Sequence, residues 1–200
     1  MASPGLPRNA GAGVAPMRTE VRGLLRRARY ALPSQIDKLT DGPGPQAAAR
    51  ICGRLHRQGL AATVGHFPGR HDTAESIAAA NLAVAARLSD GAGGGPSGAY
   101  LSVKAPPLGF DAARLHTLAE AVAAWGGSPM FDAHGPQHTD RTHTLFRDIL
   151  ADFSGTGCVR PARWPRSRKD AAWLRDSSAR LRIVKGEWAD PDGDEADVEA

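Results

Sequence analysis

Two kinds of hydrophobic pattern alternate along most of this chain. Short apolar runs, which predict strands, are separated by stretches whose apolar residues recur every three or four positions, as on one face of a helix. The predicted strands cover residues 60–67, 99–105, 129–134, 157–162 and 179–186. The helices that connect them are predicted over residues 73–88, 111–125, 140–153 and 169–177.

Regular alternation of strands and helices predicts parallel strands joined by right-handed crossovers. A barrel and a doubly wound sheet share this pattern, but polar residues at the carboxyl ends of several strands favour a barrel. These residues are Lys104, Asp132, Arg163 and Lys185. We therefore predict an α/β fold of the (β/α)₈ TIM-barrel type, incomplete with about five parallel strands and an N-terminal helical extension. The glycine-rich run at 91–98 precedes a strand, so it is not a dinucleotide-binding fingerprint.

Four segments are predicted from composition and periodicity. Residues 1–17 are rich in Gly, Pro and Ala and form a disordered lead, and residues 18–58 form a helical segment. This segment holds a short basic helix at 19–29 and a second helix at about 46–58 that ends at Gly59. Residues 59–189 form the partial barrel, and residues 190–200 form an acidic disordered tail.

Two helix starts carry capping signals. The spacing of Asp72 and Glu75 resembles a capping box ahead of the helix at 73–88. Asp111 is placed to cap the helix that carries Leu115 and Leu118.

Composition and charge narrow the class of protein. The chain is 42% hydrophobic and 6% aromatic, which suits a globular α/β protein. The net charge of +4 is segregated: residues 187–200 carry seven acidic and no basic side chains, which leaves 25 basic and 14 acidic ones before them. The arginines are scattered and match no nucleic-acid motif, so we expect no nucleic-acid partner.

Location is predicted from the cysteines and from the lack of long apolar runs. Cys52 and Cys158 match no metal-binding or disulfide pattern, so they are expected to be reduced thiols in a cytoplasmic protein with no metal. No run approaches the length of a signal peptide core or a membrane span. The basic segment at 18–29 has two interpretations, a solvated helix face or peripheral contact with the inner face of the plasma membrane.

The candidate chemistry lies where the strands end. Lys104 ends one strand, Asp132 ends the next, and Lys185 ends the last, before Gly186. Two cationic strand ends around a carboxylate would form a mouth that binds anions. The simpler interpretations are a solvated strand-end lysine and an aspartate that satisfies loop N–H groups. By alternation Arg182 and Lys185 lie on opposite faces, so both would reach the mouth only through a twist or bulge near Gly186.

Three segments then resemble strand-end motifs of the proline dehydrogenase family, in the family's order and spacing. They are YLSVKAPPLG (100–109), FDAHG (131–135) and RIVKGEW (182–188). The resemblance spans about residues 57–190 and includes TVGHFPG (63–69). It implies a distorted (β/α)₈ barrel that binds FAD, oxidises L-proline or a related imino acid to 1-pyrroline-5-carboxylate in proline catabolism, and passes electrons to a quinone.

The resemblance also implies roles for particular residues. Lys104 would bind the substrate carboxylate, and the catalytic residues would be Asp132 in the active site and Arg182 beside the reactive flavin nitrogen. The FAD contacts implied are Ala133, Lys185, Gly186, Glu187 and Trp188.

The chain departs from the family pattern at several points. Arg160 and Pro161 stand where the family's fourth strand offers a glutamine, Trp188 replaces a tyrosine, and Glu187 replaces a small residue. No segment matches the last three strands or the family's arginine pair. We therefore expect a truncated or impaired enzyme.

Alternatives remain at this point. The chain could be a non-catalytic barrel fragment that needs a partner or self-associates through exposed barrel edges. Lys104 could instead serve as the nucleophile of a Schiff-base aldolase or lyase. A metal hydrolase built on Asp132, His134 and His138 is disfavoured, because the two histidines flank a Gly-Pro turn.

Overall fold

The computed structural model describes residues 44–89, 99–186 and 188, so the predicted lead, the basic helix at 19–29 and the acidic tail lie outside the described residues. The described elements alternate as the sequence predicted. They are α3 (Pro45–Arg57), β1 (Thr63–Val64), α4 (Ala74–Ser89), β2 (Tyr100–Val103), α5 (Ala112–Ala123), β3 (Ser128–Phe131), the 3₁₀ helix η1 (Pro136–His138), α6 (Thr139–Asp152), β4 (Gly157–Pro161), α7 (Arg166–Leu174) and β5 (Arg180–Val184).

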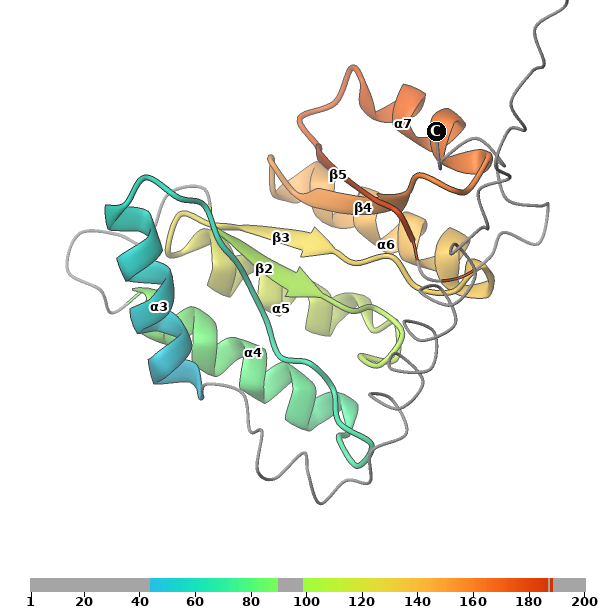
Figure 1. Cartoon of the computed structure of the whole chain (residues 1–200). Coiled ribbons are helices and arrows are strands. Elements are labelled where there is room, and N and C mark those ends of the chain that lie inside the picture. The colour runs from blue at the N-terminus through green and yellow to red at the C-terminus, as the bar shows by residue number, and fades with distance from the viewer. Residues whose placement is uncertain (1–43, 90–98, 187, 189–200) are drawn as a thin grey trace, which may run out of the picture. The chain divides into compact units, whose positions relative to one another are not determined.

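The five strands form one parallel sheet whose spatial order is the same as their order in the sequence. A doubly wound sheet reverses direction at a switch point, whereas a barrel adds each strand beside the one before it. The sheet curls, and α4, α5 and α6 cover one of its sides (Figure 1). The prediction of an incomplete barrel of about five parallel strands is therefore confirmed.

The two faces of the sheet differ in chemistry. Side chains facing the helices form the core, and Leu101, Val103 and Phe131 are each no more than 2% exposed. Residues that alternate with them along the strands face the inside of the half-barrel, where Ser102 pairs in register with Met130. The polar residues of the candidate site are on this inner side or just beyond it.

The start of α4 differs from the prediction. Asp72 and Glu75 do not form the capping box: Thr73 Oγ1 accepts a hydrogen bond from the Ser76 N–H at 3.2 Å, and Ser76 Oγ accepts one from the Thr73 N–H at 2.9 Å. The shift by one residue occurs because the Asp72 carboxylate is already engaged with the His66 ring, 2.7 Å away.

Two other helix boundaries agree with the prediction, whereas the first strand and the start of α7 (Arg166–Leu174, predicted at 169–177) differ from it. The Asp111 carboxylate accepts from the N–H of Arg114 at 3.0 Å, which confirms the predicted cap of α5. Gly59 follows α3 with φ of +73°, as expected for the residue that ends a helix. The first strand is shorter than predicted, two residues within the range 60–67, and Leu60 is 53% exposed.

Both cysteines are buried free thiols, and burial raises the pKa of each. Among the described residues no group of three or more His, Cys, Asp or Glu side chains could hold a metal ion. In the same part of the chain no helix combines the length and the apolar character needed to cross a membrane.

Candidate functional site at the carboxyl ends of the strands

The site is centred on the carboxylate of Asp132, the first residue after β3. The Lys104 ammonium, just beyond β2, donates to Asp132 Oδ2 at 2.5 Å, and the Ser102 hydroxyl donates to the same oxygen at 2.6 Å. Lys104 Nζ also lies 3.2 Å from Ser102 Oγ. Parallel register brings these groups together, because β2 and β3 end at the same edge of the sheet.

Arg182 approaches the same carboxylate from β5. Its Nη2 donates to Asp132 Oδ1 at 3.1 Å, so both oxygens of Asp132 bind cations from strands on either side of β3. Two cations and one carboxylate leave the cluster with one net positive charge. Arg182 thus reaches the predicted mouth, while Lys185, one residue beyond β5, is exposed.

The cluster is partly shielded from water, and this strengthens its electrostatic interactions. The side chains of Lys104 and Asp132 are each 16% exposed, whereas that of Arg182 is 42% exposed. Arg182 Nε is nevertheless buried and has no hydrogen-bond partner among the described residues. This N–H is therefore enclosed within the protein.

Two aromatic side chains flank the cluster. The Phe67 ring, 79% exposed in the loop after β1, lies 5.4 Å from Lys104 Nζ in a cation–π contact. Trp188, 40% exposed, packs its ring against that of His134 with centroids 5.9 Å apart. Such surfaces suit a flat ring system.

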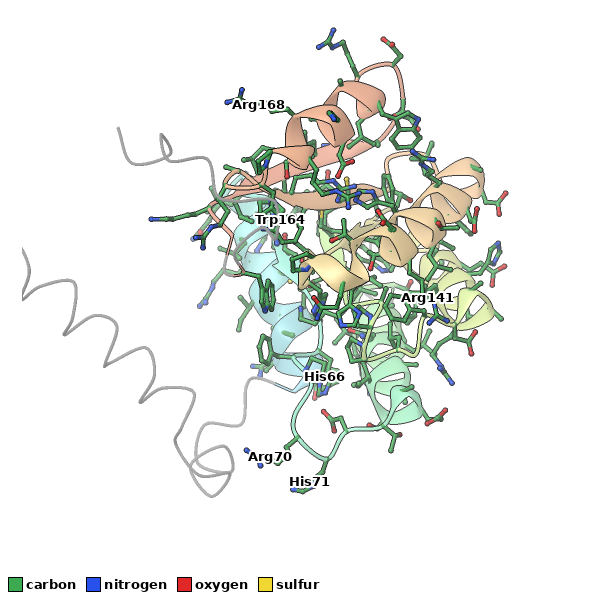
Figure 2. The ribbon with its side chains drawn as sticks, turned by 90° about the vertical axis from the view of Figure 1, so that its right-hand side faces the viewer. His66, Arg70, His71, Arg141, Trp164 and Arg168 are labelled. Carbon is green, nitrogen blue, oxygen red and sulfur yellow. The ribbon has the colours of Figure 1, made fainter. Side chains whose placement is uncertain are left out.

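The loop after β1 extends beyond Phe67 toward the N-terminus of α4. Figure 2 shows His66, Arg70 and His71 along this loop, with Arg70 and His71 pointing away from the sheet. His66 is tied back to the fold, because its N–H donates to Asn81 Oδ1 at 2.9 Å. This hydrogen bond anchors the loop at the residue before Phe67.

His134 is held neutral next to this cluster. Burial lowers the pKa of its imidazole, and the positive charge of Lys104 lowers that pKa further. The imidazole Nε2 is buried and has no hydrogen-bond partner in the described part of the chain.

The fourth strand offers the mouth no amide side chain. Arg160 is 5% exposed, lies on the helix-facing side of the sheet, and approaches Asp170 of α7 with Nε to Oδ2 at 3.5 Å. Pro161 uses its carbonyl to accept from the Ser167 hydroxyl at 2.7 Å. At Arg160 and Pro161, therefore, no side-chain amide is present where the family resemblance implies a glutamine.

The turn after β5 is shaped by Gly186, whose φ is +93°. A Cβ atom at this position would lie 2.6 Å from Cβ of Pro161, so the backbone approaches the end of β4 closely. Close packing accounts for this glycine, whether or not a ligand also contacts it. Glu187 lies outside the described residues, and Ala133 lines a small cavity behind the site.

Replacing Gly186 should measure this packing. We expect Gly186→Ala to lower the free energy of unfolding by about 2 kcal/mol, because it combines a left-handed backbone with a clash. Gly59→Ala is the matched control: φ is +73° there, but a Cβ would meet nothing within 4 Å, so about 1 kcal/mol is expected. Urea denaturation of both variants compares the two, and equal losses would mean that the contact with Pro161 costs nothing.

Strand-end positions predicted that Lys104 and Asp132 lie together, the family resemblance added Arg182, and the three do meet. It missed Ser102, which shares a strand face with Lys104 two positions later and could have been found by alternation. It also missed Phe67, for which an exposed aromatic in a loop gave only a weak signal.

The fold and the site define a class: a curled, parallel α/β half-barrel with a charged cluster at the carboxyl ends of its strands. Solved structures of this architecture resemble it. One is proline utilization A (PutA) from Bdellovibrio bacteriovorus inactivated by N-propargylglycine, with a TM-score of 0.58 and 15% identity over 85% of this chain and 21% of that one. Another is a mutant of proline utilization A from Bradyrhizobium japonicum, with a TM-score of 0.52 and 18% identity over 90% of this chain and 22% of that one.

These matches support a fold like that of one part of such proteins, and at these identities they show the fold alone. This chain spans about a fifth of the length of either protein. No family model and no curated protein matches the sequence.

Proposed function

We propose that this chain takes part in the FAD-dependent oxidation of L-proline, or a related imino acid, to 1-pyrroline-5-carboxylate in proline catabolism. The observation that carries the proposal is the bridge made by Asp132 between Lys104 and Arg182, residues 28 and 50 positions away in the sequence. Each of the three comes from a different motif of the family resemblance. A chance resemblance would not be expected to bring all three into contact.

The residues present fit a flavin in part. The Arg182 guanidinium, 42% exposed, is a donor for a ring nitrogen, and the exposed Phe67 and Trp188 rings offer apolar surface. Net positive charge at the mouth suits an anionic cofactor. We propose that Ala133, Lys185, Gly186, Glu187 and Trp188 supply further cofactor contacts.

Bound FAD would accept a hydride from the carbon next to the proline nitrogen. Arg182 would place its guanidinium where negative charge develops during that transfer, which is how preorganised donors lower a barrier. Asp132 would hold this guanidinium in place.

Lys104 would orient the substrate. An ammonium group has three N–H donors, and two of them are directed at Asp132 and Ser102. The third is left for the carboxylate of proline, and the pair with Asp132 limits the motion of the lysine. Fixing the substrate in this way contributes to rate through orientation.

The electron acceptor is proposed to be a quinone. Transfer of electrons to a membrane quinone would suit a cytoplasmic protein that associates peripherally with the inner face of the plasma membrane. A vesicle flotation assay with anionic lipids, run on the full chain, tests this part by itself.

The first experiment is the visible absorption spectrum of the purified chain after incubation with FAD and desalting. Retained flavin bands are expected, and they should be lost in Arg182→Met but kept in Arg175→Met, which removes an exposed arginine after α7. Proline-dependent reduction of a soluble quinone analogue then tests turnover. A wild-type chain that retains no flavin would overturn the claim that these strands bind the cofactor unaided.

A specific observation favours a second function, that of a barrel fragment completed by a partner. Leu181 and Ile183 on β5 are 39% and 55% exposed, although the equivalent faces of β2, β3 and β4 are buried under helices. Exposed apolar side chains on an edge strand indicate an interaction surface. Sedimentation and thermal unfolding at several protein concentrations test it, since association raises stability with concentration.

The aldolase alternative finds less support in the geometry. A nucleophilic lysine needs a free amine. The Lys104 ammonium instead donates to a carboxylate and a hydroxyl. Borohydride trapping with a carbonyl substrate should therefore leave Lys104 unmodified.

A further inference from the structure

A small cavity lies beside the candidate site, between the residues that follow β3, the first half of α6, and β4. Its volume is about 10 Å³, close to that needed for a single water molecule. Its walls include Asp132 and Ala133 on the side of the site and Trp164 on the other. Residues of three segments thus line one small space.

Polar atoms without a hydrogen-bond partner gather at this cavity, although His143 Nε2 and Arg160 Nε each lie 3.5 Å from Asp170 Oδ2. Among the described residues six buried side-chain polar atoms have no hydrogen-bond partner. Four of the six belong to residues that line the cavity: His134 Nε2, Thr142 Oγ1, His143 Nε2 and Arg160 Nε. Thr142 is 7% and Arg160 5% exposed, so bulk solvent does not satisfy them.

Buried polar groups are almost always satisfied, by protein or by an ordered water. We propose that this cavity is a binding site for one internal water molecule that joins α6, β4 and the loop carrying Asp132. The water can accept from Arg160 Nε–H and exchange hydrogen bonds with the hydroxyl of Thr142 and the two imidazoles. The inference concerns the resting protein and does not depend on the proposed function.

The groups around the cavity favour water over an anion. Burial lowers the pKa of both His134 and His143, so both rings are neutral and can accept as well as donate. The Asp132 carboxylate is part of the wall, and Asp170 lies 3.5 Å from Arg160 Nε. These negative charges oppose a bound halide, whereas a water uses donors and acceptors together.

The water would have a structural role. It would connect the backbone around Ala133, which faces the candidate site, to the rigid strand β4 and to α6. Water that makes three or four hydrogen bonds to buried groups is part of the fold and is costly to remove. The shape of the site would then depend on groups that no ligand touches.

The test uses two threonines of α6 in the full chain. Thr142→Val keeps the shape of the side chain and removes the hydroxyl at the cavity, and Thr144→Val makes the same change at an exposed position of the same helix. With a bound water, Thr142→Val should lower the melting temperature by several degrees more than Thr144→Val does. Without one, it should leave the melting temperature equal to that of the control or raise it, since an unsatisfied hydroxyl is removed.

Nuclear magnetic resonance supplies an independent readout. Cross-peaks from a long-lived water to the ring protons of His134 and His143 are expected in the wild-type chain and should weaken in Thr142→Val. A dry cavity, with no such cross-peaks, would overturn the proposal. So would stabilisation by chloride that is lost in Thr142→Val, since it would assign the cavity to an anion.

Discussion

Asp132→Asn should abolish flavin retention and lower the free energy of unfolding by about 3 kcal/mol. The substitution keeps the shape of the side chain but leaves Lys104 and Arg182 facing each other without the charge that holds them. Removing one partner of a buried ion pair costs about 3–5 kcal/mol. We expect the lower end, because Arg182 is 42% exposed and water screens part of its charge.

The control for this variant is Asp152→Asn at the end of α6. Asp152 is 62% exposed and lies 3.4 Å from the His116 ring, so its loss should change stability by no more than about 0.5 kcal/mol. Denaturant unfolding and the FAD spectrum are measured on both variants. If Asp132→Asn were as stable as Asp152→Asn and kept its flavin, the carboxylate would not organise the site.

The order of strands and helices could be predicted from the sequence because the spacing of apolar residues distinguishes the helices from the strands. Parallel strands of known order then predict which strand ends meet, which is why Lys104 and Asp132 could be brought to one mouth, whereas Arg182 was assigned to the site only by the family resemblance. The limits of β1 could not be predicted. Thr63 and Val64 pair only with β2, and Leu60, at the start of the predicted range, is exposed.

The finer geometry of the site could not be read from the sequence. Alternation placed Arg182 and Lys185 on opposite faces, but only the fold shows that Arg182 reaches Asp132. The cap of α4 moved from Asp72 to Thr73 because a tertiary contact with His66 competed for the carboxylate. Competing hydrogen bonds of this kind depend on distances between segments that no local pattern encodes.

The ionic groups under α6 and α7 were also missed by sequence reasoning. Arg160 of β4 and Arg166 of α7 approach Asp170, and the His143 ring lies 3.5 Å from the same carboxylate. Helix and strand positions far apart in the sequence meet here. A buried arginine in a strand is the one signal that could have pointed to it, since a buried charge needs a partner.

Acid should destabilise the protein through His143, by about 3 kcal/mol once the pH is well below 4. Burial lowers the pKa of His143 from 6.5 to about 4, and Arg160 acts in the same direction. Arg166 also lowers it, while Asp170 and Asp140 oppose the shift. The folded state therefore binds fewer protons than the unfolded state between these two values, so this stability is present above pH 6.5 and is lost as the pH falls toward 4.

The variant that isolates this effect is His143→Gln, whose amide stays neutral at every pH. Stability is measured by urea unfolding from pH 7 to pH 4 in both chains. The wild type should lose about 2 kcal/mol more than the variant by pH 5, since each unit between the two pKa values is worth about 1.4 kcal/mol. Parallel curves would mean that the imidazole titrates alike in both states and that the cluster tolerates a charged ring. Steeper loss in the wild type would show that neutral His143 is built into the packing of α6 against β4 and α7.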